Sequence, residues 1–223
     1  MVKFIKRLLL SHFYVDVILL VVTACFMLLE WSSLTVDHQL AYVLFFGMCL
    51  HQLEEYRFPG GFVWGQNTVA LNSDMPDRYP GNRLSAVFVD VFAMFISAPF
   101  LYWHYTSSMA MIFAIFAMIE VVIHILFGTM ALMKFKDQGK ETIYFPGSFT
   151  SWVFFAPFGI VLIYKLVDNN LMTGNAWWWT VGILVAYFIF GFALPFLAFA
   201  NRNTPYVYDQ EPREGFYFQR YTK

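Results

Sequence analysis

Apolar residues dominate six stretches of the chain, each about as long as the hydrocarbon core of a bilayer requires. A helix that crosses this core needs roughly 20 predominantly apolar residues. Shorter polar segments with turn-forming residues separate the stretches, and such segments interrupt helices. The pattern therefore predicts an all-α, polytopic transmembrane bundle of about six helices. The expected spans are 12–31, 39–57, 84–103, 108–133, 148–167 and 177–200.

These spans fill most of the chain and leave no room for a second large domain. We expect residues 1–200 to form a single six-helix transmembrane domain. Residues 201–223 are polar and aromatic, and we expect them to form a solvent-exposed cytoplasmic tail. The tripeptide Phe-Pro-Gly begins at Phe58 and again at Phe145. We interpret both copies as chain reversals at cytoplasmic helix ends, because Pro and Gly stop or start helices.

Composition and charge agree with a membrane protein. Only 13% of the residues are charged and 59% are hydrophobic, whereas soluble domains carry roughly 25% charged residues. No basic tract of the kind that binds nucleic acid is present, so the expected partner is the lipid bilayer.

The basic residues predict the orientation, because Lys and Arg accumulate in cytoplasmic loops. With the N-terminus inside, every Lys and Arg except Lys165 falls on the cytoplasmic side, and an odd number of spans would scramble this regularity. We therefore expect both termini in the cytoplasm and the protein in the cell (inner) membrane. The residues on the cytoplasmic side are Lys3, Lys6, Arg7, Arg57, Arg78, Arg83, Lys134, Lys136, Lys140, Arg202, Arg213, Arg220 and Lys223.

The second, third and fourth expected spans contain six Asp, Glu and His residues, and charged groups are costly inside a membrane. Side chains three or four residues apart share a helix face, so the acids of the second span face the same way as its histidine. Alternate spans run in opposite directions, which places all six groups between mid-depth and the cytoplasmic side. We expect them to meet in one layer. They are His51, Glu54 and Glu55 in the second span, Asp90 in the third, and Glu120 and His124 in the fourth.

Four carboxylates and two imidazoles in one apolar layer need positive charge among them, in the form of protons or of a metal ion. Oxygen and nitrogen donors from separate helices suit Zn, Mn or Fe, and no thiolate joins them. We therefore expect a divalent metal and assign Glu54 and Glu55 as the candidate catalytic carboxylates. The predicted metal ligands are His51, Glu54, Glu55, Glu120 and His124.

One alternative remains open, in which the same groups form hydrogen-bonded pairs with one another or with Arg57 or Arg83. Asp90, Arg57, Asn82 and Arg83 are the residues that we expect to support the site from outside, and Asn82 is also a candidate helix cap. His12 and Asp16, four residues apart in the first span, are interpreted as an interfacial pair.

The segment from His51 to Phe62, His-Gln-Leu-Glu-Glu-Tyr-Arg-Phe-Pro-Gly-Gly-Phe, resembles the bacterial HXXEE-motif membrane protein family. Members are similar in carrying His-x-x-Glu-Glu before an aromatic-Pro-Gly turn, then a Glu-x-x-x-His helix and a Tyr-x-Pro-Gly turn. Glu120 to His124 and the Tyr144-Phe145-Pro146-Gly147 turn stand at those places. Ser148 departs from the Leu or similar residue that usually follows.

The resemblance implies a compact multi-helix membrane domain. It implies no particular reaction, because the family has no settled activity. It also marks five positions as characteristic of the family: His51, Glu54, Glu55, Glu120 and His124.

The residues favour a membrane-embedded, metal-dependent enzyme of hydrolase or transferase type that acts on a lipid or another apolar substrate. One alternative is a transporter or proton-coupled channel that uses the same carboxylates as proton carriers, although the outer halves of the helices are almost wholly apolar. Another is a non-catalytic accessory subunit of a membrane complex. A glutamate protease of the Glu-Glu-x-x-x-Arg type is disfavoured, because Pro59 stands where the Arg is required. The pattern specifies no protein partner.

Overall fold

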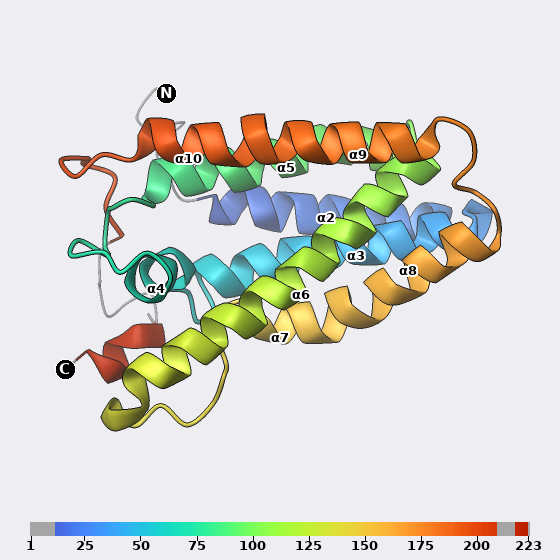
Figure 1. Ribbon diagram of the computed structural model, residues 1–223. Helices are drawn as coiled ribbons and strands as arrows, with labels where there is room; N and C mark the ends of the chain where they lie inside the picture. Colours follow the sequence, from blue (N-terminus) through green and yellow to red (C-terminus); the bar gives the residue numbers. More distant parts are fainter. Residues whose placement is uncertain (1–11, 209–216, 223) are drawn as a thin grey trace.

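The computed structural model describes residues 12–208 and 217–222, and these residues form helices and no strand (Figure 1). The expected class, all-α, is confirmed. Five of the basic residues used for the orientation, Lys3, Lys6, Arg7, Arg213 and Lys223, lie outside the described residues.

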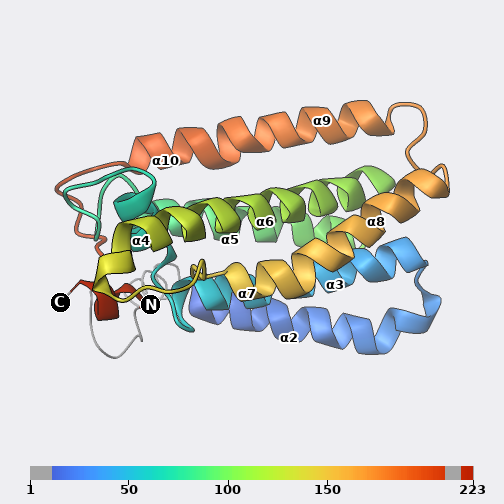
Figure 2. The same ribbon diagram turned by 60° about the horizontal axis from the view of Figure 1, so that its bottom comes forward.

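The long helices run alongside one another in three tiers (Figure 2). One tier holds α9 (Ala176–Ala186) and α10 (Leu194–Phe199), which a π-helical turn at Tyr187–Ala193 joins into one rod. The middle tier holds α5 (Arg83–Tyr102) and α6 (Ser107–Phe135), and α6 crosses the bundle diagonally (Figure 1).

The third tier is formed by α2 (Phe13–Glu30), α3 (Val36–Tyr56) and a rod that ends in α8 (Ala156–Asp168). This rod begins with α7 (Ser148–Thr150) and continues through a π-helical turn at Ser151–Phe155. The start of α2 and the end of α10 lie at the same end of the bundle.

Five helical stretches are long and apolar enough to cross a membrane: Phe13–Ser33, Arg83–Tyr102, Ser107–Gln138, Ser148–Asp168 and Ala176–Phe199. They match five of the six expected spans and are those of a multi-pass membrane protein.

The second expected span is α3, which is not among these five because its polar residues reduce its apolar character. It has 21 residues and is therefore about 31 Å long, and it packs against α2, α6 and α8. Its neighbours cover His51, Gln52, Glu54 and Glu55, which are all buried. Thus α3 carries the polar groups and the surrounding helices supply the apolar surface.

The short helix α4 (Phe62–Val69) and a 3-10 helix at Tyr217–Tyr221 close the end of the bundle at which α3 ends. Phe218 of this 3-10 helix is fully buried and packs with Trp64 and Phe145. The expectation of a solvent-exposed tail is therefore wrong for this part.

Lys140 joins the same assembly. Its ammonium donates hydrogen bonds to the Tyr144 carbonyl (2.7 Å) and the Tyr217 hydroxyl (2.8 Å). Burial, with the Arg220 guanidinium nearby, lowers the pKa of Lys140 to about 8.

The loop between α6 and α7 passes directly over α6. A Cβ atom on Gly128 would lie 1.8 Å from the carbonyl oxygen of Ile143, so only glycine permits this approach. Replacing Gly128 by alanine must displace the loop backbone, and we expect Gly128→Ala to destabilise the fold by about 1–3 kcal/mol. Thermal unfolding of the detergent-solubilised protein, followed by circular dichroism, measures this.

The matched control is Gly182→Ala in α9, where an added Cβ meets nothing within 4 Å. Because alanine favours helices more than glycine does, this variant should be as stable as the unmodified protein or slightly more so. Equal stability of both variants would show that Ile143 does not pack on Gly128.

Candidate metal centre

Four side chains from two helices bring one donor atom each to a common point. They are His51 and Glu55 on α3 and Glu120 and His124 on α6, and their donor atoms all lie within 4.8 Å of one another. Each pair is four residues apart on its own helix, so each helix offers one imidazole and one carboxylate on a single face. Both imidazoles are buried.

Three of the donors form a close triangle. Oε1 of Glu55 lies 3.2 Å from Nε2 of His51 and 3.1 Å from Nε2 of His124, and the two nitrogens are 3.3 Å apart. Oε2 of Glu120 lies farther out, at 3.9 Å and 3.7 Å from the same nitrogens.

The three distances within the triangle suit a tetrahedral ion, whereas the two distances to Glu120 are longer. Zn–N and Zn–O bonds of about 2.0–2.1 Å place neighbouring ligand atoms about 3.3–3.4 Å apart. Charge suits it as well, because two ionised carboxylates and two neutral imidazoles carry the two negative charges that a divalent cation cancels, and uncompensated charge is costly inside a bundle. The four donors can therefore hold a metal ion.

The turn before α7 lies against the Cε1 edges of both imidazoles. Gly147 has φ +97°, and a Cβ there would lie 2.3 Å from Cε1 of His124 and 2.8 Å from Cε1 of His51. A side chain at this position would fill the space that the rings occupy. The second Phe-Pro-Gly turn is thus part of the site, and the interpretation of this copy as a chain reversal alone is incomplete.

A hydrogen-bonded chain holds His51 from the other side of its ring. Nδ1 of His51 lies 2.9 Å from the Thr150 hydroxyl, and this hydroxyl donates to Oε2 of Glu54 at 2.7 Å. With the hydroxyl proton given to Glu54, the Thr150 oxygen accepts from Nδ1–H, which leaves the lone pair on Nε2 facing the other donors. Such outer hydrogen bonds fix the tautomer of metal-binding histidines.

Glu54 is not one of the four grouped residues. Besides the Thr150 hydroxyl, its oxygens accept hydrogen bonds from the Tyr144 hydroxyl and from the backbone N–H groups of Phe149 and Thr150, at 2.8, 3.1 and 2.8 Å. These N–H groups open the α7 helix, where a carboxylate is favoured. Glu54 thus makes four hydrogen bonds to the start of α7 and the loop before it, one of them to the hydroxyl that contacts His51. The sequence predicted it as a metal ligand, which stays a prediction.

Asp90 lies beside the site on α5 and accepts a hydrogen bond of 2.5 Å from the Tyr56 hydroxyl. The ring of His12 packs edge-on against Tyr56, and Nδ1 of His12 lies 3.0 Å from Oδ2 of Asp16. His12 and Asp16 do form the expected pair, with both members buried; their position at the membrane interface stays a prediction.

The other expected supporting residues lie elsewhere. Asn82 caps α5, accepting from the backbone N–H groups of Leu84 and Ser85, as the alternative interpretation expected. The guanidinium of Arg57 lies over the Phe13 ring, and that of Arg83 lies over the Tyr208 ring.

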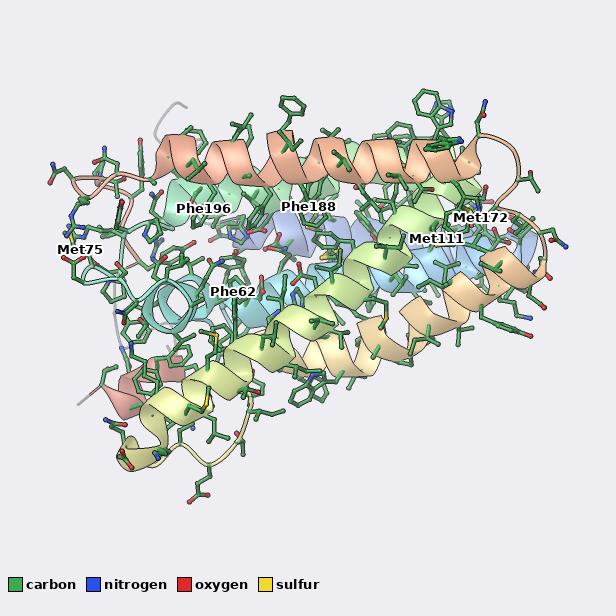
Figure 3. The ribbon with its side chains drawn as sticks, viewed as in Figure 1. Phe62, Met75, Met111, Met172, Phe188 and Phe196 are labelled. Carbon is green, nitrogen blue, oxygen red and sulfur yellow. The ribbon has the colours of Figure 1, made fainter. Side chains whose placement is uncertain are left out.

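A cavity of about 190 Å³ is lined by three of the four grouped residues, His51, Glu55 and Glu120. Glu55 and Glu120 line it together with aromatic rings that include Phe62, Phe188 and Phe196. Figure 3 shows Phe62 on one side of this region and Phe188 and Phe196, from the rod of α9 and α10, on the other. Glu120 is the most exposed of the four grouped side chains, at 16%, so the cavity gives a small molecule access to the looser side of the site.

Neither Thr150 nor the structural role of Gly147 was predicted from the sequence. The Tyr-x-Pro-Gly pattern contains the only signal that pointed to this region, because Tyr144 and Gly147 both belong to it. Thr150 lies three residues beyond the pattern and has no feature that separates it from other threonines.

Comparison with family models gives one match, to the family described as "Protein of unknown function with HXXEE motif", over residues 42–162. This range is more than half of the chain and contains all four grouped residues. Searches of curated proteins and of solved structures gave no significant match.

Removing the hydroxyl of Thr150 should loosen the orientation of His51. We expect Thr150→Val to weaken binding of Zn²⁺ by roughly 10–100-fold, the usual cost of losing an outer hydrogen bond to a metal ligand. Competition with a fluorescent zinc chelator in detergent measures the affinity.

Two controls separate this effect from general damage. Thr150→Ser keeps the hydroxyl and should restore most of the affinity, whereas Thr129→Val removes an exposed hydroxyl of α6 that bonds only the Ile125 carbonyl and should change nothing. If Thr150→Val binds zinc as tightly as Thr129→Val does, the hydrogen-bonded chain has no positioning role.

Proposed function

Since the chain belongs to the family of proteins of unknown function with an HXXEE motif, we propose its function from the chemistry of its own site. The proposal is a membrane-embedded, metal-dependent enzyme of the hydrolase or transferase type that acts on a lipid or another apolar substrate. The observation that carries it is the close triangle of donor atoms from His51, His124 and Glu55 beside a cavity.

The proposed ligands are His51, His124 and Glu55. Two imidazoles and one carboxylate form a ligand set that zinc enzymes use when one coordination position stays open. Zn, Fe or Mn are all compatible with nitrogen and oxygen donors. When bound, such an ion polarises a carbonyl or phosphoryl group and makes a water molecule more acidic.

Glu120 is proposed as the general base. Its carboxylate is farther from both nitrogens than that of Glu55, and it lines the cavity through which a reactant would arrive. A carboxylate within reach of a water molecule accepts its proton as the oxygen attacks. Glu54 keeps the positioning role that its hydrogen bonds support.

We also propose that the protein lies in the cell (inner) membrane with six spans, α3 being the sixth, and with both ends in the cytoplasm. The length of α3 and the placement of Lys and Arg support this arrangement. The metal centre would then lie on the cytoplasmic side of the bilayer midplane, because His51 and Glu55 come in the last two turns of α3.

Purified protein should contain stoichiometric metal. Inductively coupled plasma mass spectrometry of protein purified without chelators measures this, and the double substitution of His51 and His124 by alanine should remove the metal. The control is His104→Ala, which changes an exposed histidine at the opposite end of the bundle. Folded protein that binds neither Zn²⁺, Mn²⁺ nor Fe²⁺ on titration would contradict the proposal.

The two grouped carboxylates should differ in their effects. Glu55→Gln should weaken metal binding by more than roughly 100-fold, because it removes a ligand and not an outer partner. Glu120→Gln has the same change of charge and size and should keep the metal, since its oxygen lies outside the triangle. Equal metal loss in both variants would assign Glu120 as a ligand and leave the base unidentified.

A further inference from the structure

A second, larger cavity adjoins the 190 Å³ cavity and extends into the apolar part of the bundle. Its volume is about 320 Å³, and α3, α5, α6 and the rod of α9 and α10 enclose it. Five residues line both this cavity and the 190 Å³ cavity beside Glu120: Met48, Gln52, Asp90, Phe116 and Tyr187. The two spaces therefore meet at these side chains, of which Gln52 and Asp90 are the most polar.

The larger cavity is polar at the end near the metal centre and apolar beyond it. On α3 its lining runs from Gln52 back to Leu44, and on α5 from Asp90 onward to Ser97. Eight residues of helix span about 12 Å, so the cavity follows each helix for roughly two turns away from the site. Met, Phe, Ile and Leu side chains supply most of this wall.

Gln52 lies where the two cavities meet, and its amide oxygen lacks a hydrogen-bond donor. The amide N–H of Gln52 donates to Asp90, because a carboxylate can only accept. Oε1 of Gln52 is left buried without a hydrogen-bond partner in the described structure. A buried acceptor without a donor is unfavourable, so a bound molecule that donates a hydrogen bond here would be favoured.

We propose that the substrate is a single-chain amphiphile. Its alkyl chain fills the 320 Å³ cavity, and its first polar group, a hydroxyl or an amide N–H, donates to Oε1 of Gln52 beside the four grouped donors. This rests on the proposed function, and it identifies Gln52 as the residue that selects substrates with a donor next to the chain.

The shape and polarity of the space favour this occupant over other molecules. A soluble polar substrate would leave the Met and Phe wall uncovered, and a pure hydrocarbon would leave the Gln52 oxygen unpaired. A molecule with both parts satisfies the two ends at once.

The test uses the full chain in phosphatidylcholine nanodiscs and a dodecanol probe that carries a photoreactive diazirine in its chain. Mass spectrometry should find crosslinks on the cavity lining. Unlabelled dodecanol should compete roughly three- to tenfold better than dodecyl methyl ether, which lacks the donor. In Gln52→Leu the alcohol and the ether should compete equally.

Two neighbouring substitutions on α9 show whether the chain lies inside. Leu184 lines the cavity, whereas Val185 is 52% exposed on the outer face and does not. Leu184→Trp should reduce crosslinking severalfold, and Val185→Trp should leave it unchanged. Crosslinks confined to outward-facing residues, or equal effects of the two tryptophans, would overturn the inference.

Measuring the metal content of the same preparations separates this inference from the proposed function. Metal-loaded protein without crosslinks in the cavity overturns the substrate assignment alone. Crosslinks in the cavity of wild-type protein that binds no metal support the chain-binding site and overturn the metal-dependent enzyme instead.

Discussion

Two carboxylates and two imidazoles meet at one point between α3 and α6, inside a bundle of otherwise apolar helices. Glu55 contacts both His51 and His124, whose Nε2 atoms face each other at 3.3 Å. When both Nε2 atoms offer lone pairs to this point, the two nitrogens repel each other, and two ionised carboxylates repel as well. A divalent cation removes both repulsions at once.

Much of the surrounding structure serves to hold these four groups. Glu54 of α3 accepts hydrogen bonds from the backbone N–H and the hydroxyl of Thr150 at the start of α7. The same hydroxyl contacts Nδ1 of His51. Gly147 gives the two imidazoles their space, and Gly128 lets the loop before that turn lie close to α6. The two glutamates of the motif therefore make different contacts. Glu55 faces the other three donors, and Glu54 faces the start of α7.

The sequence predicted the parts of this arrangement that depend on hydrophobic pattern and helical spacing. Five spans and the pairing of His51 with Glu55 and of Glu120 with His124 follow from runs of apolar residues and from steps of four residues. The spacing could not separate Glu54 from Glu55, because both share a face with His51 and only the packing of α7 distinguishes them. Thr150 and Gly147 were beyond reach for the same reason, since their contacts join segments almost 100 residues apart in the chain.

X-ray absorption spectroscopy of the metal-loaded protein in nanodiscs tests the central claim most directly. We expect nitrogen and oxygen neighbours only, with the multiple-scattering pattern of two imidazole rings that disappears when His51 and His124 are replaced. A bound ion without imidazole scattering, or with sulfur neighbours, would place the metal away from the motif and contradict a centre built from His51 and His124.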